Sequence, residues 1–503
     1  MSIEPGFHEH PSFPIFNAAI CSGDCKLMIL WHNPRLRIRC WQATVIGCVV
    51  FALITFTSRS TLAAPAAQLD PLLPLGQVLW QQAKISLSDL LGMDGARSYL
   101  ILVQNNQELR ATGGFISAIG KLTLENGSIR ELDFTDSYTF FQADLEYPAA
   151  PKPMQQYMNI QLLLLRDANW SPDFPTTAKL IQGFYTQQTG TPLAGVITLD
   201  LQAATLLVDA IGPLEIPGAP MPITGENFVE QVLQFWEKPI GTEVTIQASG
   251  LGEWWGQRKD FVAVLAQAAR ERVQSGNVNY GKLAWSVQKA LRQRSIQIWV
   301  AQPALAQQLG LFGWDGALRP APDADFVGLV DTNMGFNKVD AVLQRSLAYA
   351  VTWPDGPTAP ALATAVITYT HPITLPNYTC TNTPAYGENY NFLIERCYYD
   401  YVRLYTPAGS ILESVDGVEA DSVVTQRGEN QTQYFAGYFV LPVGQQHTVT
   451  FRYRLPAYIT PENYTLQIQR QSGANPLPVT ITVGEQTLTT TLADAKLRWS
   501  SAP

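Results

Sequence analysis

Residues 99–138 constrain the fold of this chain more than any other stretch. The segment Tyr99-Leu-Ile-Leu-Val103 is too apolar for a surface strand and predicts a strand that is buried on both faces. It is followed at once by the polar run Gln104–Arg110 and then by Gly113-Gly114. The polar run therefore lies at the C-terminal mouth of the strand. In open α/β sheets this mouth is the usual ligand crevice.

Two interpretations of this corner remain open. As a ligand site, Gly113 and Gly114 would let backbone amides approach a ligand, and Arg110 would offer a planar fork to phosphate or carboxylate. As a brace, Arg110 would pair with Glu108 inside a turn, and the glycines would only supply positive φ angles. The candidate pyrophosphate ligands are Asn106, Glu108, Arg110, Gly113, Gly114, Arg166 and Arg258.

The order of elements around the corner predicts an α/β domain with a mixed sheet over residues 70–315. Asn126-Gly127 predicts a β-hairpin turn, and Gly195–Asp200 predicts a second buried strand. Gly190 is expected to end a helix that contains Ala178 and Tyr185. Further elements are expected as helices at 70–94, 202–211, 226–236, 258–273 and 280–291 and as a strand at 296–300.

Residues 320–503 have a different sequence pattern from the α/β domain. Short apolar segments recur at regular spacing between prolines and glycines, which predicts a C-terminal β-sandwich. A polar corner, Asn333–Lys338, precedes the first of these segments and either packs at the domain interface or adds a cation to the site. The seven expected strands are 347–353, 363–370, 399–405, 433–441, 447–453, 464–470 and 479–483.

An apolar run in residues 41–58 indicates export. It follows Arg35, Arg37 and Arg39, so residues 1–40 are expected to form a cytoplasmic tail and the bulk of the chain to lie outside the cell membrane. A cleaved signal peptide and a retained single-pass anchor both fit. After residue 60 the sequence contains only two cysteines, Cys380 and Cys397, which predicts one disulfide in an oxidising compartment.

Composition excludes several functions. The formal net charge of −9 argues against nucleic-acid binding. Only His371 and His447 follow the apolar run, so Ser-His-Asp and Cys-His catalysis are disfavoured in the α/β domain. P-loop and dinucleotide fingerprints are missing. Arginines and carboxylates at loop corners fit a pyrophosphate with Mg²⁺, and Asp136 and Asp173 are the candidate metal ligands. No catalytic residue is identified.

Five strings of this sequence resemble the bacterial family of domain of unknown function 4012, over roughly residues 75 to 500. They are Asn105–Phe115, Asp136-Ser-Tyr138, Ser171–Pro175, Gly195–Asp200 and Ile211-Gly-Pro213. The family name implies no settled activity.

A more remote similarity is to the LytR-CpsA-Psr family. It rests on the order of Gly195–Pro213, Thr224–Phe228 and Gln257-Arg258. Members of that family are membrane-anchored transferases that move glycopolymers from a polyprenyl pyrophosphate carrier onto peptidoglycan, using arginines, acids and Mg²⁺. The present chain departs from them, because it has no Pro-Arg-Asp string after the first strand pair.

The similarity implies that Arg110 and Arg258 contact the pyrophosphate and that Asp136 is a metal-side carboxylate. It leads us to expect an exported, membrane-anchored envelope protein that binds a polyprenyl-linked or anionic glycan. Whether the protein also transfers the glycopolymer as a phosphotransferase stays open. The alternative is a non-catalytic extracytoplasmic scaffold or binding protein in which the same corner braces the domain.

Overall fold

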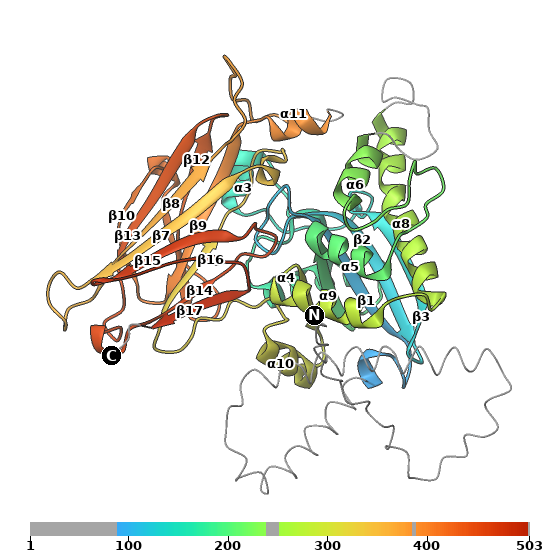
Figure 1. Cartoon of the computed structure of the whole chain (residues 1–503), viewed down its shortest axis with the longest axis horizontal. Coiled ribbons are helices and arrows are strands. Elements are labelled where there is room, and N and C mark those ends of the chain that lie inside the picture. The colour runs from blue at the N-terminus through green and yellow to red at the C-terminus, as the bar shows by residue number, and fades with distance from the viewer. Residues whose placement is uncertain (1–87, 238–250, 385–388, 501–503) are drawn as a thin grey trace, which may run out of the picture.

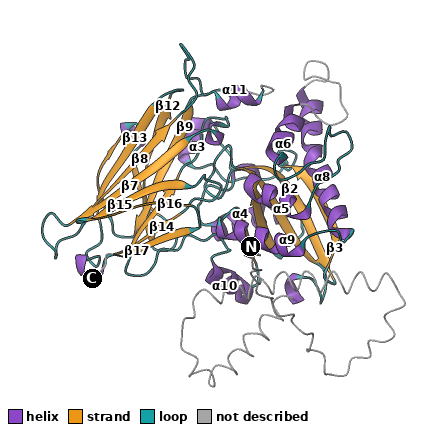
Figure 2. Ribbon diagram, in the orientation of Figure 1, coloured by secondary structure: helices purple, strands orange, loops and turns teal. Residues whose placement is uncertain are grey.

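The computed structural model describes residues 88–237, 251–384 and 389–500. In Figure 1 they form two bodies that lie side by side. Helices surround a sheet in one body, and the other consists mainly of strands, as Figure 2 shows. We call residues 88–237 with 251–312 the α/β domain, and residues 325–384 with 389–500 the sandwich domain. The predicted fold class, α/β with a mixed sheet followed by a β-sandwich, is confirmed.

The α/β domain is built on a five-stranded mixed sheet with the order β3-β2-β1-β4-β5. At its centre β1 is antiparallel to β2 and parallel to β4. Leu100 and Leu102 of β1 pack against α4 (Phe174–Thr189), while Tyr99 packs with α9 (Tyr280–Arg292) on the other face. The first strand is therefore buried on both faces, as predicted. The strands are Arg97–Asn105 (β1), Phe115–Glu125 (β2), Ser128–Asp136 (β3), Gly195–Asp200 (β4) and Ile296–Val300 (β5).

Local signals set the ends of several helices. The predicted stop of α4 at Gly190 is confirmed, because Gly190 has a left-handed φ of 68° and caps the helix. Asp200 ends β4 and caps the next helix by accepting a hydrogen bond from the backbone N–H of Ala203. The other helices of this domain are Lys152–Met158 (α3), Leu165–Asp167 (η3), Leu201–Ile211 (α5), Phe228–Glu237 (α6), Leu251–Gln274 (α8) and Pro303–Phe312 (α10).

The hairpin between β2 and β3 is also confirmed. Asn126 and Gly127 form a two-residue turn between the paired residues Glu125 and Ser128. Their φ angles are 52° and 70°, and positive φ at both positions is the signature of the type I′ turn that suits twisted strands.

The sandwich domain contains two six-stranded sheets, with the orders β10-β13-β8-β7-β15-β16 and β11-β12-β9-β6-β14-β17. Apolar side chains from both sheets form one core between them. The strands are Asp325–Val330 (β6), Gln344–Thr352 (β7), Leu362–Thr370 (β8), Tyr398–Pro407 (β9), Ile411–Asp416 (β10), Val424–Arg427 (β11), Thr432–Leu441 (β12), Gln446–Arg454 (β13), Thr465–Gln469 (β14), Leu477–Val483 (β15), Gln486–Leu492 (β16) and Lys496–Ser500 (β17); short helices lie at Val339–Ala341 (η4), Tyr390–Ile394 (α11), Ala420–Ser422 (η5) and Pro461–Asn463 (η6).

Five of these strands were not predicted. Four of them, β10, β11, β16 and β17, are the edge strands of the two sheets. Edge strands carry polar and charged side chains that blunt their open side, so their apolar signal is weak. The fifth, β6, lies inside its sheet, and every one of its residues is buried. Asp325 and Gly328 interrupt its apolar pattern.

Asp325 lies in the sandwich core with its side chain fully enclosed. Its Oδ2 accepts hydrogen bonds from the hydroxyls of Tyr349 and Tyr464, each at 2.6 Å. Burial raises the pKa of Asp325 to about 6, because the charged form loses its hydration, and the two hydroxyls offset only part of that cost.

We expect the stability of the protein to fall as the pH rises from about 4.5 to 7. The folded-state pKa of Asp325 lies above the unfolded value of about 3.9, so its stabilising contribution is complete below about pH 4 and is lost as the pH rises through about 6. Asp325→Asn should remove about 2 kcal/mol of this fall. Part of the fall should remain, because burial also raises the pKa values of Asp200 and Asp340 to about 6.

Urea denaturation at a series of pH values measures this effect. Asp416→Asn is the matched control, because Asp416 is an exposed carboxylate of the same domain. Equal pH slopes for Asp325→Asn and the wild type would contradict the prediction.

The predicted disulfide between Cys380 and Cys397 is present, with a Cα–Cα distance of 5.6 Å. The predicted cytoplasmic tail, the apolar run of residues 41–58 and most of the helix expected at 70–94 lie outside the described residues. Within the described part of the chain, none of the helices combines the length and apolar character that a membrane span requires.

Candidate functional site

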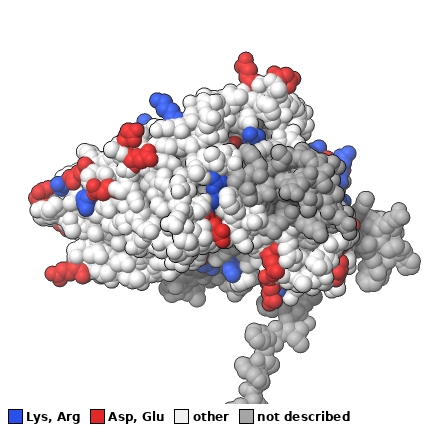
Figure 3. All heavy atoms as spheres, turned by 90° about the horizontal axis from the view of Figure 1, so that it is seen from above, with Lys and Arg blue, Asp and Glu red and all other residues white. Residues whose placement is uncertain are grey.

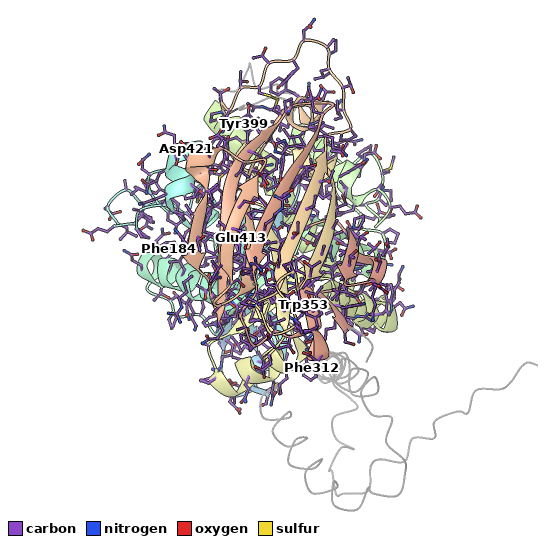
Figure 4. All side chains as sticks on the ribbon, turned by 90° about the vertical axis from the view of Figure 1, so that its left-hand side faces the viewer. Phe184, Phe312, Trp353, Tyr399, Glu413 and Asp421 are labelled. Carbon is purple, nitrogen blue, oxygen red and sulfur yellow. A yellow bond between two sulfur atoms is a disulfide. The ribbon has the colours of Figure 1, made fainter. Side chains whose placement is uncertain are left out.

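The corner after β1 lies at the interface between the two domains. The backbone N–H of Leu109 donates to Oδ2 of Asp340 at 3.0 Å, and the N–H of Asn333 donates to the carbonyl of Leu109 at 3.1 Å. Asn333 belongs to the polar corner that follows β6. Of the two roles predicted for this second corner, packing at the interface is thus observed. The N–H of Met334, in this second corner, donates to the carbonyl of Tyr399. The second corner therefore lies at the end of the sandwich domain where Figure 4 labels Tyr399.

Arg110 makes the internal contacts that the brace interpretation requires. Its guanidinium donates to Oε1 of Glu108 at 2.9 Å and to the carbonyl of Asn333 at 2.6 Å. The side chain is only 3% exposed, so these bonds are shielded from water. One further donor, Nε, is buried without a partner among the described residues. Arg110 therefore braces the interface and keeps one donor unused.

The two glycines are required by contacts within the protein. Gly113 has a φ of 143°, and a Cβ there would lie 2.0 Å from Oε1 of Gln104. A Cβ on Gly114 would lie 2.1 Å from the carbonyl oxygen of Asn105. The sandwich reaches the same place, since a Cβ on Gly473 would lie 2.0 Å from the carbonyl oxygen of Gly113.

Asn106 also faces the sandwich domain. Its Nδ2 donates to the carbonyl of Gly473 at 3.0 Å. A parallel β-bridge joins Thr112 to Ser472 beside it, and Nε2 of Gln471 donates to the carbonyl of Arg110 at 3.1 Å. Asn106 and Gly113 thus lie at the seam between the domains, whereas the close neighbours of Gly114 belong to the α/β domain.

A cavity of about 580 Å³ opens next to this seam, with polar and apolar groups in about equal measure in its lining. We call it the polar cavity after its charged residues. Both domains line it, and it brings together three of the predicted ligand residues, Glu108, Arg110 and Arg166. Lys338 from the second corner adds a third cation, so the role of that corner as a source of positive charge has a geometric basis as well. The remaining lining residues are Asn105, Phe115, Ser117, Tyr138, Gln156, Tyr157, Met158, Asn159, Ile160, Asp167, Phe336, Asn337, Asn382, Pro384 and Leu393.

Arg166 lies at one wall of the polar cavity. Its guanidinium carbon is 4.5 Å from the ring centroid of Tyr138, within the range of a cation–π interaction, and its Nε is 3.6 Å from Oδ2 of Asp167. Burial raises the pKa of Asp167, and the positive charges of Arg110 and Arg166 oppose that rise. With three cations and two carboxylates, the lining favours an anionic ligand.

A second cavity, of about 280 Å³, is almost wholly apolar. It lies at the carboxyl ends of β1 and β4, the sheet end at which the sequence placed a ligand crevice, and helices α5, α6 and α8 form its walls. Leu207, Val232 and Leu265 are among its lining residues. Asn105, Ser117 and Lys338 line both cavities, so the apolar cavity meets the polar one at these residues.

The candidate metal ligands lie in other surroundings. Oδ1 of Asp136 accepts a hydrogen bond from the backbone N–H of Tyr138 at 2.9 Å. Asp173 caps α4 and also accepts from the N–H of Leu318 and from Nδ2 of Asn430, each at 2.9 Å. Neither residue lines the polar cavity. Among the side chains that the structure describes there is no group of three or more His, Cys, Asp or Glu that could hold a metal ion.

Arg258 lies within α8, but its side chain is outside the described part of the structure. Its predicted contact with a pyrophosphate therefore stays a prediction.

The apolar cavity was not predicted from the sequence. One signal for it exists in α5, whose sequence Leu-Gln-Ala-Ala-Thr-Leu-Leu-Val-Asp-Ala-Ile is apolar on more than one face. A helix of that kind packs on its sheet and also has apolar side chains to cover on another side. Here Ala203 packs into the sheet core, while Ala204, Leu207 and Val208 line the cavity.

On the face seen in Figure 3, charged side chains are scattered among uncharged ones, and the coloured atoms of this face form no continuous basic surface.

Comparison with solved structures finds remote neighbours. The crystal structure of protein gbs0355 from Streptococcus agalactiae is 14% identical over 44% of this chain and 73% of that chain, with a TM-score of 0.25. The structure of the Lin1025 protein from Listeria innocua is 12% identical over 38% of this chain and 80% of that chain, with a TM-score of 0.19. At these identities and TM-scores, neither structure indicates what the site binds.

No curated protein matches the chain. A family model does match, over the stretch that contains the corner after β1, the Arg166 wall and helix α5. Residues 94–235 match the family described as Protein of unknown function (DUF4012), the family that the sequence strings resemble.

Proposed function

We propose that the protein is an exported, membrane-anchored envelope protein that binds a polyprenyl-pyrophosphate-linked or other anionic glycan. The observation that carries the proposal is the meeting of the two cavities at Asn105, Ser117 and Lys338. A ligand with an anionic headgroup and an apolar chain has the same division of polarity. Pockets of this size are typical of small-molecule sites.

The proposed location has two supports. The apolar run of residues 41–58 follows three arginines, the arrangement of an export signal. The disulfide between Cys380 and Cys397 is of the kind that persists in oxidising compartments. The proposal concerns binding, and Mg²⁺ enters it as a counter-ion of the pyrophosphate. Transfer of the glycopolymer would be a further step.

The second candidate function is a non-catalytic extracytoplasmic scaffold. The observation in its favour is the engagement of Arg110 with Glu108 and Asn333, which binds the two domains together without a ligand.

Calorimetric titration of the full chain in nanodiscs with farnesyl pyrophosphate, with and without Mg²⁺, tests the proposal, and empty nanodiscs supply the blank. We expect binding by the wild type and at least a tenfold loss in Ala204→Trp, which fills the apolar cavity. Each excluded CH₂ group contributes about 0.8 kcal/mol, and about 1.4 kcal/mol is a factor of ten.

Gln187→Trp on the exposed face of α4 is the control for the size of the new side chain. Absence of binding by a folded wild type would sink the proposal and favour the scaffold.

A further inference from the structure

Lys338 belongs to the sandwich domain, yet it lines both the polar and the apolar cavity. Neither Arg110 nor Arg166 lines the apolar cavity, and Lys338 is the one cation in its described wall. The residue as a whole is 8% exposed, so its charge is held away from bulk water. Lys338 also lies outside residues 94–235, the stretch that the family model matches.

The turn that carries Lys338 is held by a dense set of hydrogen bonds. Oδ1 of Asn337 accepts from the N–H of Val339 at 3.1 Å and from Nδ2 of Asn333 at 2.9 Å. Nδ2 of Asn337 donates to the carbonyl of Cys397 at 3.0 Å, one of the two disulfide residues. The N–H of Lys338 itself donates to the carbonyl of Leu393 at 3.0 Å. The backbone at Lys338 is therefore fixed before any ligand arrives.

The backbone of this turn is also strained. Phe336 has a φ of 46°, a left-handed conformation that is a true outlier for a bulky side chain. Such strain persists only where the surrounding contacts overdetermine it, and it clusters at binding sites. Phe336 lines the polar cavity beside Asn337 and Lys338.

The acidic side chains around the cavities are held within the α/β domain. Glu108 is paired with Arg110, and Asp167 lies beside Arg166. The carboxylate in the wall of the apolar cavity is Asp200, which caps α5 through the N–H of Ala203. Each acidic side chain in the two walls thus has a donor within the α/β domain.

We propose that Lys338 holds the anionic group of the ligand at the point where headgroup and apolar chain join, so that the two domains form one binding site. This inference rests on the proposed function and names the residue that binds the anionic group of the ligand. The α/β domain supplies the apolar wall that contacts the hydrocarbon chain of the ligand, and the sandwich domain supplies the cation Lys338.

The test compares the binding of two probes, farnesyl pyrophosphate and farnesol, which have the same hydrocarbon chain. The full-length protein is titrated in nanodiscs, and empty nanodiscs supply the blank. The wild type should bind the pyrophosphate at least tenfold more tightly than the alcohol. In Lys338→Met the affinity for the pyrophosphate should fall at least tenfold, and the affinity for farnesol should stay within twofold. Lys338→Arg should keep the preference, because it keeps the charge.

Lys152→Met is the matched control, because Lys152 is an exposed lysine outside both cavities, and it should behave as the wild type. If Lys338→Met does not fold, Lys338→Gln replaces it in the same comparison. A folded neutral variant that keeps the wild-type preference would overturn the role of Lys338 and leave the proposed function standing. A folded wild type that binds neither probe would overturn both.

Discussion

Replacing Arg110 with alanine is expected to lower the free energy of unfolding by about 3 kcal/mol. The variant leaves Glu108 without its buried partner and removes the 2.6 Å hydrogen bond from the guanidinium to the carbonyl of Asn333. Breaking a buried ion pair from one side typically costs about 3–5 kcal/mol, and the partial exposure of Glu108 places this case at the low end. Denaturation in urea, followed by circular dichroism, measures the change.

Arg97→Ala is the matched control for Arg110→Ala. Arg97 also pairs with a carboxylate, Asp89, but both side chains are about one-third exposed, so its loss should cost less than about 1 kcal/mol. A loss for Arg110→Ala no larger than that for Arg97→Ala would rule out the brace. If such a stable variant also lost the binding of farnesyl pyrophosphate, Arg110 would be a ligand residue instead.

Replacing Gly473 with alanine is expected to loosen the seam between the two domains. Gly473 has a φ of 75°, and the new Cβ would lie 2.0 Å from the carbonyl oxygen of Gly113, a backbone atom that cannot rotate away. The left-handed conformation alone costs about 1–2 kcal/mol, and the forced separation should add about 1–3 kcal/mol. We therefore expect a lower melting temperature and earlier exposure of the interface around Asn106, which bonds to Gly473.

Gly484→Ala separates the two contributions. Gly484 also has a positive φ, of 57°, in the same domain, but its Cβ would meet nothing within 4 Å. It should show only the conformational cost of about 1–2 kcal/mol. Thermal unfolding and hydrogen exchange of the corner after β1 measure both variants. Equal losses in the two alanine variants would show that the contact between Gly473 and Gly113 does not hold the domains together.

Local sequence signals account for most of the α/β domain. Five apolar residues in a row predicted the buried strand at Tyr99–Val103, Asn126-Gly127 predicted a hairpin, and Gly190 predicted the end of a helix. Each of these depends on neighbours within a few positions, where side-chain pattern and allowed φ angles decide the outcome. The disulfide was predictable by elimination, because only Cys380 and Cys397 follow residue 60.

The edge strands and β6 were not predictable in the same way. Edge strands such as β10 and β17 have one neighbour only, and their polar residues resemble those of loops. In β6 a buried Asp325 breaks the apolar pattern, and only Tyr349 and Tyr464, which arrive from other strands, satisfy its carboxylate.

The sequence alone indicated that the corner at Gln104–Gly114 is either a ligand site or an internal brace, and it identified Glu108 and Arg110 as the residues involved. Only the tertiary structure decided what the corner contacts. Its partners Asp340 and Gly473 lie 231 and 367 positions away from Leu109 and Asn106, and no local pattern encodes such pairings. The same holds for the apolar cavity and for Lys338 beside it. Periodicity shows which face of an element is buried, whereas packing in three dimensions determines what covers that face and where it is left open.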